Sequence, residues 1–115
     1  MKKFIVLYFA PMGAMEKQME ESSPEDMKKG MEAWMAWAKK CGSNLLDLGT
    51  PLGNGQKVTA DGSKGSDKGV VGYSVLQAND MSEAVKLMKD HPHIKWHAAC
   101  EIEVCECMPL PGSQK

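Results

Sequence analysis

Three histidines lie close together late in the chain, and histidine is the side chain whose charge changes most readily near neutral pH. They are His91, His93 and His97. His93 or His97 is a candidate general base, because an imidazole can take a proton from a substrate and later return it. Such a base needs an orienting carboxylate, and the candidates nearest in sequence are Asp90, Glu101 and Glu103. The alternative is that all three histidines are ordinary loop residues.

Cysteines follow these histidines, which raises the question of a zinc site. Cys100, Cys105 and Cys107 form no C-x-x-C pair, and the H-x-H-x-x-x-H spacing places its donors in a loop rather than on one helical face. We therefore expect no metal site. The glycine-rich stretches at 53–55 and 62–69 lie in an expected hairpin rather than between a strand and a helix, so we expect no nucleotide cofactor.

Several aromatic and polar side chains are candidates for binding a small organic molecule. A pocket for such a ligand combines apolar or aromatic walls with a few polar groups. The residues that fit this description are Tyr8, Trp37, Tyr73 and Glu103. The alternative for the tyrosines is packing in a subunit interface with satisfied hydroxyls. Positions 34 and 37 are about 300° apart around a helix, so Trp34 and Trp37 cannot both point straight into one groove. Trp34 is expected to pack in the core.

The charge balance excludes several classes of partner. The chain has 115 residues, of which 14 are basic and 15 acidic, and its formal net charge is -1. Every basic residue is a lysine. A chain that is nearly neutral and lacks arginine has no footprint for nucleic acid or for an anionic membrane surface. No stretch approaches the roughly 20 apolar residues of a membrane span.

The first residues superficially resemble a secretory signal. Met1-Lys2-Lys3 precedes an apolar stretch over 4–10, but no cleavage pattern follows, and a buried strand explains the stretch better. We therefore expect a cytoplasmic protein whose cysteines stay reduced. These cysteines are Cys41, Cys100, Cys105 and Cys107.

Hydrophobic patterning predicts four strands and two helices in one domain over residues 1–115. The clearest helix covers 24–41, with Ser23 as its N-cap and Gly42 as its C-cap. Its apolar stripe consists of Met27, Met31, Trp34, Met35, Ala38 and Cys41. A second helix begins at Asp80 and ends before Pro92. Strands are expected over 4–10, 44–52 with a continuation over 57–60, 69–78 and 100–108, with a flexible loop over 61–69 and a tail over 109–115.

This β-α-β-β-α-β order predicts a ferredoxin-like α+β fold. In that topology a four-stranded antiparallel sheet carries both helices on one face, and its first and third strands lie in the middle. No helix remains to cover the other face, so Val71, Tyr73 and Val75, or the opposite set, would be exposed. We therefore expect a homodimer that forms through the sheet face.

Short motifs along the chain resemble the YCII-related family. They are Trp34-Met35-Ala36-Trp37, Gly49-Thr50-Pro51-Leu52-Gly53, Gly72-Tyr73-Ser74, His91-Pro92-His93-Ile94, Ile102-Glu103-Val104 and Met108-Pro109. The resemblance implies a dimeric α/β barrel of ferredoxin-like protomers, with a cleft near the dimer face that holds a small molecule. Some members look like enzymes with a His–Asp pair near the first strand and helix, whereas no histidine precedes His91 here.

Two functions remain open on these grounds. The first is the binding of a small organic molecule in a cleft near the dimer face. The alternative is a cofactor-independent enzyme that acts on a small organic acid or aromatic compound by proton abstraction or elimination, with a histidine base. A purely structural dimer would lack a cavity of ligand size, and the fold alone does not choose among these.

Overall fold

The computed structural model describes residues 1–11, 13, 17, 20–89, 91–96 and 99–111 of the chain. The strands and helices follow the expected order, with a hairpin and short helices in addition. The elements are β1 (Lys2–Phe9), α2 (Pro24–Cys41), the 3₁₀ turn η1 (Gly42–Asn44), β2 (Leu45–Asp47), β3 (Gln56–Thr59), β4 (Gly62–Gly65), β5 (Val70–Ala78), α3 (Met81–Leu87), α4 (Pro92–Trp96) and β6 (Glu101–Glu106).

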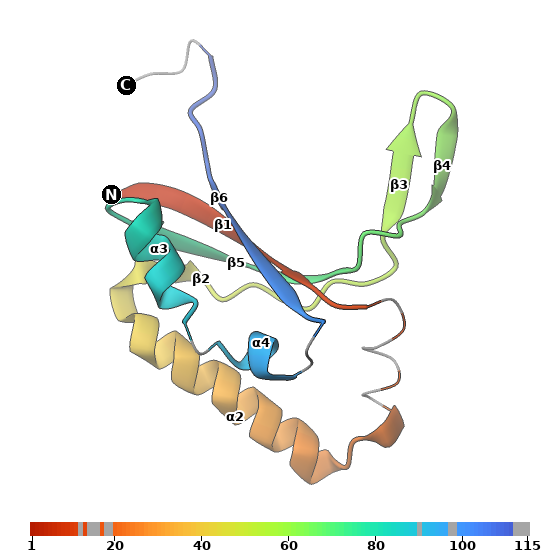
Figure 1. Ribbon diagram of the computed structural model, residues 1–115, viewed down its shortest axis with the longest axis horizontal. Coiled ribbons are helices and arrows are strands. Elements are labelled where there is room, and N and C mark those ends of the chain that lie inside the picture. Colours follow the sequence, from red (N-terminus) through yellow and green to blue (C-terminus); the bar gives the residue numbers. More distant parts are fainter. Residues whose placement is uncertain (12, 14–16, 18–19, 90, 97–98, 112–115) are drawn as a thin grey trace.

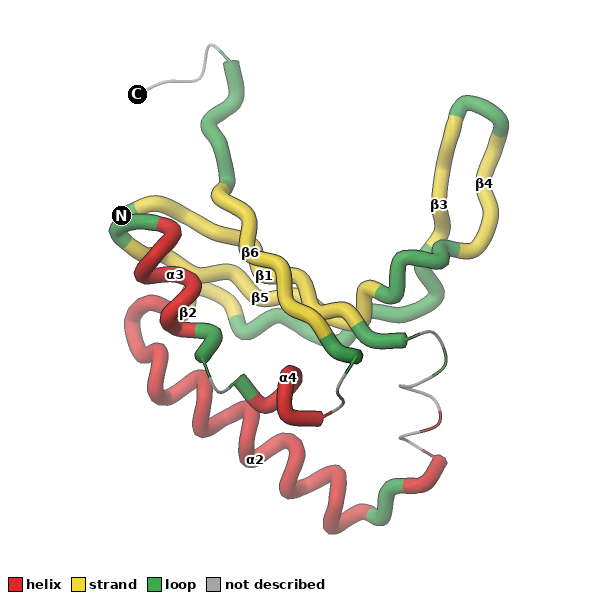
Figure 2. Tube along the Cα trace, in the orientation of Figure 1, coloured by secondary structure: helices red, strands yellow, loops and turns green. Residues whose placement is uncertain are grey.

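The main sheet has the strand order β2-β5-β1-β6, and every neighbouring pair is antiparallel. Strands β1 and β5, which are the most apolar, lie in the middle, as predicted. Figure 1 and Figure 2 show α2, α3 and α4 on the same side of this sheet. The chain therefore has the ferredoxin-like α+β fold. Within its described residues, none of the helices has the length and apolar character needed to cross a membrane.

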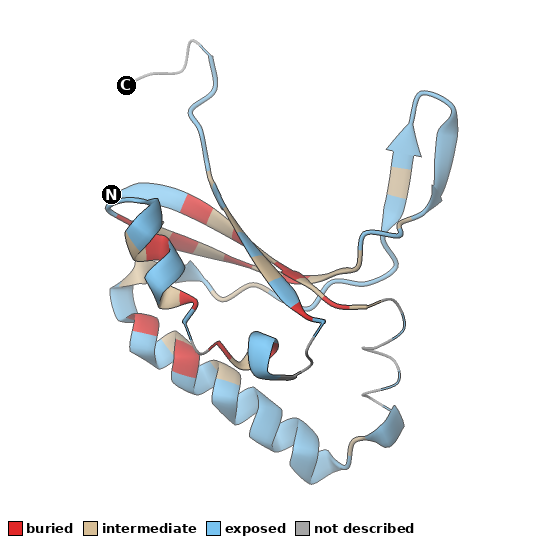
Figure 3. Cartoon of the chain, viewed as in Figure 1, coloured by how far each residue is buried: buried red, intermediate tan, exposed pale blue. Residues whose placement is uncertain are grey.

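The sheet face toward the helices forms the core. Val6 pairs with Ser74 on one side and with Val104 on the other, so these three residues share that face. Phe4, Val6 and Tyr8 are almost completely buried, and Figure 3 shows the alternation of buried and less buried positions along β1 and β5. This alternation follows from the pleat of a strand, which points successive side chains to opposite faces.

The helices α2, α3 and α4 all leave the opposite face of the sheet uncovered (Figure 1). Ile5, Leu7 and Val75 lie on this face and are half-buried, while Glu103 and Cys105 of β6 are exposed there. The predicted set of Val71, Tyr73 and Val75 is half-buried in the single chain rather than exposed. The central strands of this face are apolar, and its role as a dimer interface stays a prediction.

Helix α2 begins and ends where the sequence predicts. The Ser23 hydroxyl accepts a hydrogen bond from the Asp26 amide at 3.1 Å, and the Asp26 carboxylate accepts one from the Ser23 amide at 3.2 Å. This reciprocal capping box satisfies two amides that the helix itself leaves unpaired. At the other end, Gly42 donates to the Ala38 carbonyl with a φ of 56°, a conformation that favours glycine.

The predicted buried stripe of α2 is wrong at its three methionines. Met27, Met31 and Met35 are 47%, 60% and 52% exposed. Trp37, which lies outside the predicted stripe, is buried, and Trp34 is half-buried. Figure 1 shows why: the C-terminal end of α2 lies near the sheet, whereas its N-terminal end diverges from it.

The second strand is shorter than the predicted range of 44–52. Within this range, only β2 pairs with β5 as a regular strand. The range pairs with β5 once more, at an isolated bridge between Pro51 and Gly72. Gly49, with a φ of 80°, interrupts the extended backbone between these two contacts. Pro51 in addition has no amide hydrogen for a ladder hydrogen bond, so the segment after Gly49 cannot continue as a regular strand.

The next hairpin corrects two expectations. Residues 57–60 were expected to continue the second strand, but β3 instead pairs with β4 in a separate two-stranded sheet. Residues 62–65 were expected within a loop over 61–69 and form β4. Figure 1 shows this hairpin projecting away from the helices.

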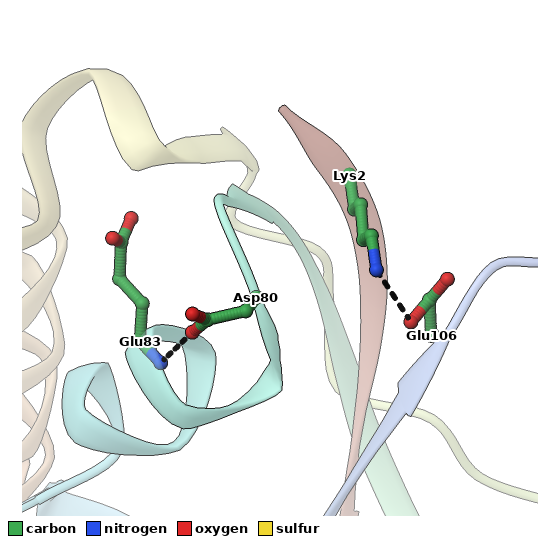
Figure 4. A network of polar contacts seen from close by, with 4 residues as sticks. All are labelled: Lys2, Asp80, Glu83 and Glu106. Carbon is green, nitrogen blue, oxygen red and sulfur yellow. Dashed lines mark hydrogen bonds and ion pairs between the residues drawn. The ribbon is translucent and has the colours of Figure 1, made fainter.

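The described residues of the second half of the chain form two helices, α3 and α4, where one was predicted. Helix α3 is capped by the Asp80 carboxylate, which accepts the Glu83 amide at 2.8 Å, and ends at Leu87. Pro92 does not end this helix but begins α4, because proline is tolerated at a first helical position. Figure 4 shows the Asp80 cap together with the ion pair of Lys2 and Glu106, which joins β1 and β6 at 3.8 Å.

Candidate functional site

A cleft of about 510 Å³ lies between the diverging half of α2 and the sheet. Five segments line it: the end of β1, the first turns of α2 with Ser22 just before them, the segment after β2, the start of β5 and the start of α4. The lining residues are Tyr8, Ser22, Asp26, Met27, Gly30, Met31, Trp34, Leu48, Gly49, Thr50, Pro51, Val71, Gly72, Tyr73, Pro92 and His93. Its volume falls in the range of small-molecule sites, and most of these side chains are apolar.

Two glycines allow the segment after β2 to form one wall of the cleft. A Cβ atom at Gly49 would lie 1.8 Å from the carbonyl oxygen of Tyr73, so no other residue fits this approach. The Gly49 amide donates to the Asp47 carboxylate at 2.9 Å, which holds the turn. A Cβ atom at Gly72 would come within 3.3 Å of the Tyr8 ring. The wall therefore packs directly against backbone of β5.

Tyr8 presents its ring to the cleft and fixes its hydroxyl inside the protein. The hydroxyl is 2.8 Å from the Ser74 hydroxyl, which donates to the carbonyl of Leu48 at 2.6 Å. Because that carbonyl can only accept, the Tyr8 hydroxyl donates to Ser74. Burial raises the pKa of Tyr8 to about 12, although the Ser74 hydrogen bond opposes the shift. Tyr8 is thus neutral at pH 7 and acts as a rigid wall.

His93 is buried at the start of α4 and lines the cleft. Its Nε2 atom lies 2.8 Å from the carbonyl oxygen of Phe9, so Nε2 carries the proton and donates it. Burial lowers the pKa of His93, and the hydrogen bond to Phe9 opposes this shift. The imidazole is therefore neutral at pH 7, and the bond to β1 fixes its orientation.

His91 is completely buried beside the cleft but does not line it. Its Nδ1 atom accepts the amide of His93 at 3.0 Å, which places the proton of the neutral ring on Nε2. Among the described residues, that Nε2 atom has no hydrogen-bond partner. Burial and then the nearby His93 lower the pKa of His91 to about 3. His91 is therefore a neutral structural residue that organises the turn into α4.

Aromatic rings surround His91 and connect α2 to the sheet. Its ring centroid lies 4.4 Å from that of Trp37, 4.6 Å from that of Trp34 and 5.0 Å from that of Tyr8. Trp34 and Tyr8 also meet edge to face at 5.0 Å. The Trp37 indole donates to the carbonyl of Leu87 at 2.8 Å, which ties α2 to α3. Two members of this cluster, Tyr8 and Trp34, also line the cleft.

The structure brings together some of the candidate residues and separates others. Tyr8, Tyr73 and His93 all line the cleft. Tyr73 follows Gly72 on β5, so its side chain points to the opposite sheet face and its backbone borders the cleft. Trp37 packs in the core without lining the cleft, and Glu103 is exposed on the open sheet face.

His97 and Asp90 lie outside the described residues. The partner that the structure gives to the Nε2 atom of His93 is a backbone carbonyl. Glu101 and Glu103 are exposed on β6. In the part of the chain that is described, no three histidine, cysteine, aspartate or glutamate side chains are close enough to hold a metal ion.

Sequence reasoning missed the α2 wall of this cleft. The cleft lies on the helix side of the sheet. The family resemblance implied a cleft near the dimer face, and that stays a prediction. Met27, Gly30, Met31 and Trp34 recur at helical spacing, a signal that marks one face of a helix but equally fits core packing. The motif around Gly49 was noticed only as a resemblance.

Comparisons with known proteins give a fold neighbour but no family. No family model matches the chain, and no curated protein is similar in sequence. Among solved structures, the chain is similar to 5-chloro-2-hydroxyhydroquinone dehydrochlorinase from Burkholderia phenoliruptrix AC1100, in complex with 2,5-dihydroxybenzoquinone. The two are 14% identical with a TM-score of 0.50, and the match covers 88% of this chain and 90% of the other. At this identity the likeness supports the ferredoxin-like fold.

Proposed function

We propose that the chain is a YCII-related cytoplasmic protein that binds a small organic molecule between α2 and the sheet. The observation that carries this proposal is the cleft of about 510 Å³ with aromatic and methionine walls. Burial of apolar ligand surface in such a cleft supplies roughly 25 cal/mol per Å². Met27 and Met31 form the exposed side of the wall, and their flexible side chains can adapt to the shape of a ligand.

The binding proposal predicts where a ligand binds and which substitution weakens its binding. The probe is 2-naphthalenemethanol, titrated into ¹⁵N-labelled protein. We expect chemical-shift changes at Gly30, Trp34 and Gly72. Met31→Trp should fill the cleft and weaken binding about fivefold or more, because its side chain lines the cleft. Met35→Trp is the matched control, since Met35 is on the same helix, similarly exposed and outside the cleft.

Equal affinity of the Met31→Trp and Met35→Trp variants would contradict the proposal. Shift changes confined to the open sheet face would contradict it as well, because the ligand would then bind elsewhere.

The proposal includes a homodimer formed through the open sheet face. Ile5, Leu7 and Val75 present half-buried apolar side chains there, on the face opposite to the helices α2, α3 and α4 (Figure 1). A second copy would remove this surface from water. Val75→Lys should shift sedimentation equilibrium toward the monomer, whereas Val58→Lys on the exposed hairpin is the control and should leave the mass unchanged. A wild-type monomer at micromolar concentration would refute this part.

A second candidate function is cofactor-independent proton abstraction or elimination, and the position of His93 favours it. This imidazole lines the cleft and is neutral at pH 7, the form that can accept a proton. The solved neighbour is named a dehydrochlorinase, and loss of hydrogen chloride is an elimination. The enzyme would need a substrate carbon acid held against this ring.

His93→Gln separates the two functions. If the chain only binds, the variant should retain affinity for 2-naphthalenemethanol within about threefold, because the apolar walls are intact. If the chain is an enzyme, turnover of a chlorohydroquinone should disappear with the variant, and the wild-type rate should depend on a group titrating below pH 6.5. Turnover that survives in the variant would exclude His93 as the base.

A further inference from the structure

The charges around the cleft are unevenly distributed. Of the described residues that line it, Asp26 is the only one with a formal charge at pH 7. The chain has no arginine, and every lysine except Lys115 belongs to the described residues. None of these lysines lines the cleft. Among the described residues, an anionic ligand would therefore find no side-chain cation there.

The N-terminus of α2 does not supply a substitute for a cation. Helix N-termini attract anions through unpaired amides. Here the Asp26 amide donates to the Ser23 hydroxyl and the Ser23 amide to the Asp26 carboxylate, so both are already used. Glu25 and Asp26 add two negative charges to the same first turn. An approaching anion therefore meets two carboxylates at a helix end where the capping box already uses two of the amides.

The interior of the cleft is equally unfavourable to an anion. Most of its described lining is apolar, including Met27, Met31 and Val71. The indole of Trp34 and the hydroxyls of Ser22 and Thr50 can donate a hydrogen bond, but all three groups are uncharged. The imidazole of His93 donates its Nε2 proton to a backbone carbonyl. A carboxylate that enters the cleft loses hydration and gains uncharged donors in place of a cation, so its desolvation is costly.

From this distribution we infer that the cleft selects uncharged, largely apolar molecules and rejects carboxylates and other anions. The inference rests on the proposed binding function and narrows it. The enzyme hypothesis left two substrate classes open, a small organic acid and an aromatic compound. The inference favours a neutral aromatic compound over the acid.

The test compares two probes with the same ring and carbon number, 2-naphthalenemethanol and 2-naphthoate, by the chemical shifts of the cleft residues. We expect 2-naphthoate to bind about tenfold or more weakly than the alcohol. Asp26→Asn keeps an oxygen for the Ser23 amide and should strengthen 2-naphthoate binding about threefold at low salt, with the alcohol unchanged. Glu25→Gln is the control, since it removes the same charge from a residue that does not line the cleft.

The possible outcomes are distinguishable. Equal or tighter binding of 2-naphthoate, with shifts at Gly30 and Gly72, would overturn the inference and leave the binding function intact. No binding of either probe at millimolar concentration would overturn both. An equal effect of Asp26→Asn and Glu25→Gln on 2-naphthoate would show that Asp26 has no specific role, and would overturn the part of the inference that depends on it.

Discussion

Gly30 lies in the middle of α2 and lines the cleft, so its replacement should separate stability from binding. Glycine in a helix interior costs about 0.5–1 kcal/mol relative to alanine. A Cβ atom built at Gly30 meets no atom within 4 Å. No steric penalty therefore offsets the gain, and Gly30→Ala should raise the free energy of unfolding by about 0.5–1 kcal/mol. The midpoint of thermal unfolding should rise by about 2–5 °C.

A larger side chain at the same position should act on the cleft. Gly30→Leu should keep most of the gain in stability, because leucine is also a good helix former. Its side chain would occupy space that a ligand needs, and we expect binding of 2-naphthalenemethanol to weaken about tenfold. Ala36→Leu is the control, since Ala36 is exposed on the same helix and does not line the cleft. Urea denaturation and ligand titration measure the two effects separately.

Two results would refute this reasoning about Gly30. If Gly30→Ala were destabilised, position 30 would need glycine for a close contact or a backbone conformation, and the structure shows neither at this position. Unchanged ligand affinity in Gly30→Leu, with the Ala36→Leu variant also unchanged, would show that the ligand does not reach this face of α2.

Three further perturbations test the polar contacts around the cleft. Ser74→Ala should destabilise the protein by about 1–3 kcal/mol in urea denaturation, because the buried hydroxyl of Tyr8 loses its acceptor. Trp37→Phe should cost about 1–2 kcal/mol in the same assay, because the carbonyl of Leu87 loses the indole donor. The free energy of unfolding should fall as the pH drops from 6.5 toward 3. In the unfolded chain the imidazole of His91 takes up a proton below its ordinary pKa of 6.5, whereas burial lowers its pKa in the folded protein to about 3. This loss should reach a few kcal/mol and be smaller in His91→Phe, and an identical pH profile in the variant would contradict it.

The strength of local signals explains which elements sequence analysis predicted well. Helix α2 was predicted with correct ends because Ser23, Pro24 and Gly42 act on neighbouring backbone groups. The short helix α4 was missed, since His91 caps it through a side chain that only the fold positions. The hairpin of β3 and β4 was missed because its exposed polar residues carry no hydrophobic periodicity.

The sequence by itself determined the fold class and the central strands. The apolar character of β1 and β5 requires cover on the helix face and leaves an apolar surface on the other. Periodicity and caps are local properties, so they can be read residue by residue. Among the candidate site residues, Tyr8 and His93 were identified on chemical grounds, and both line the cleft.

The cleft itself was decided by the tertiary structure. Helical spacing placed Met27, Met31 and Trp34 on one face of α2 but could not tell how far that face lies from the sheet. The distance depends on the divergence of α2 (Figure 1) and on Gly49, which lets one wall approach the backbone of β5. Both are long-range relations between elements, and a local pattern carries no information about them. Only the assembled chain therefore distinguishes a binding wall from a core stripe.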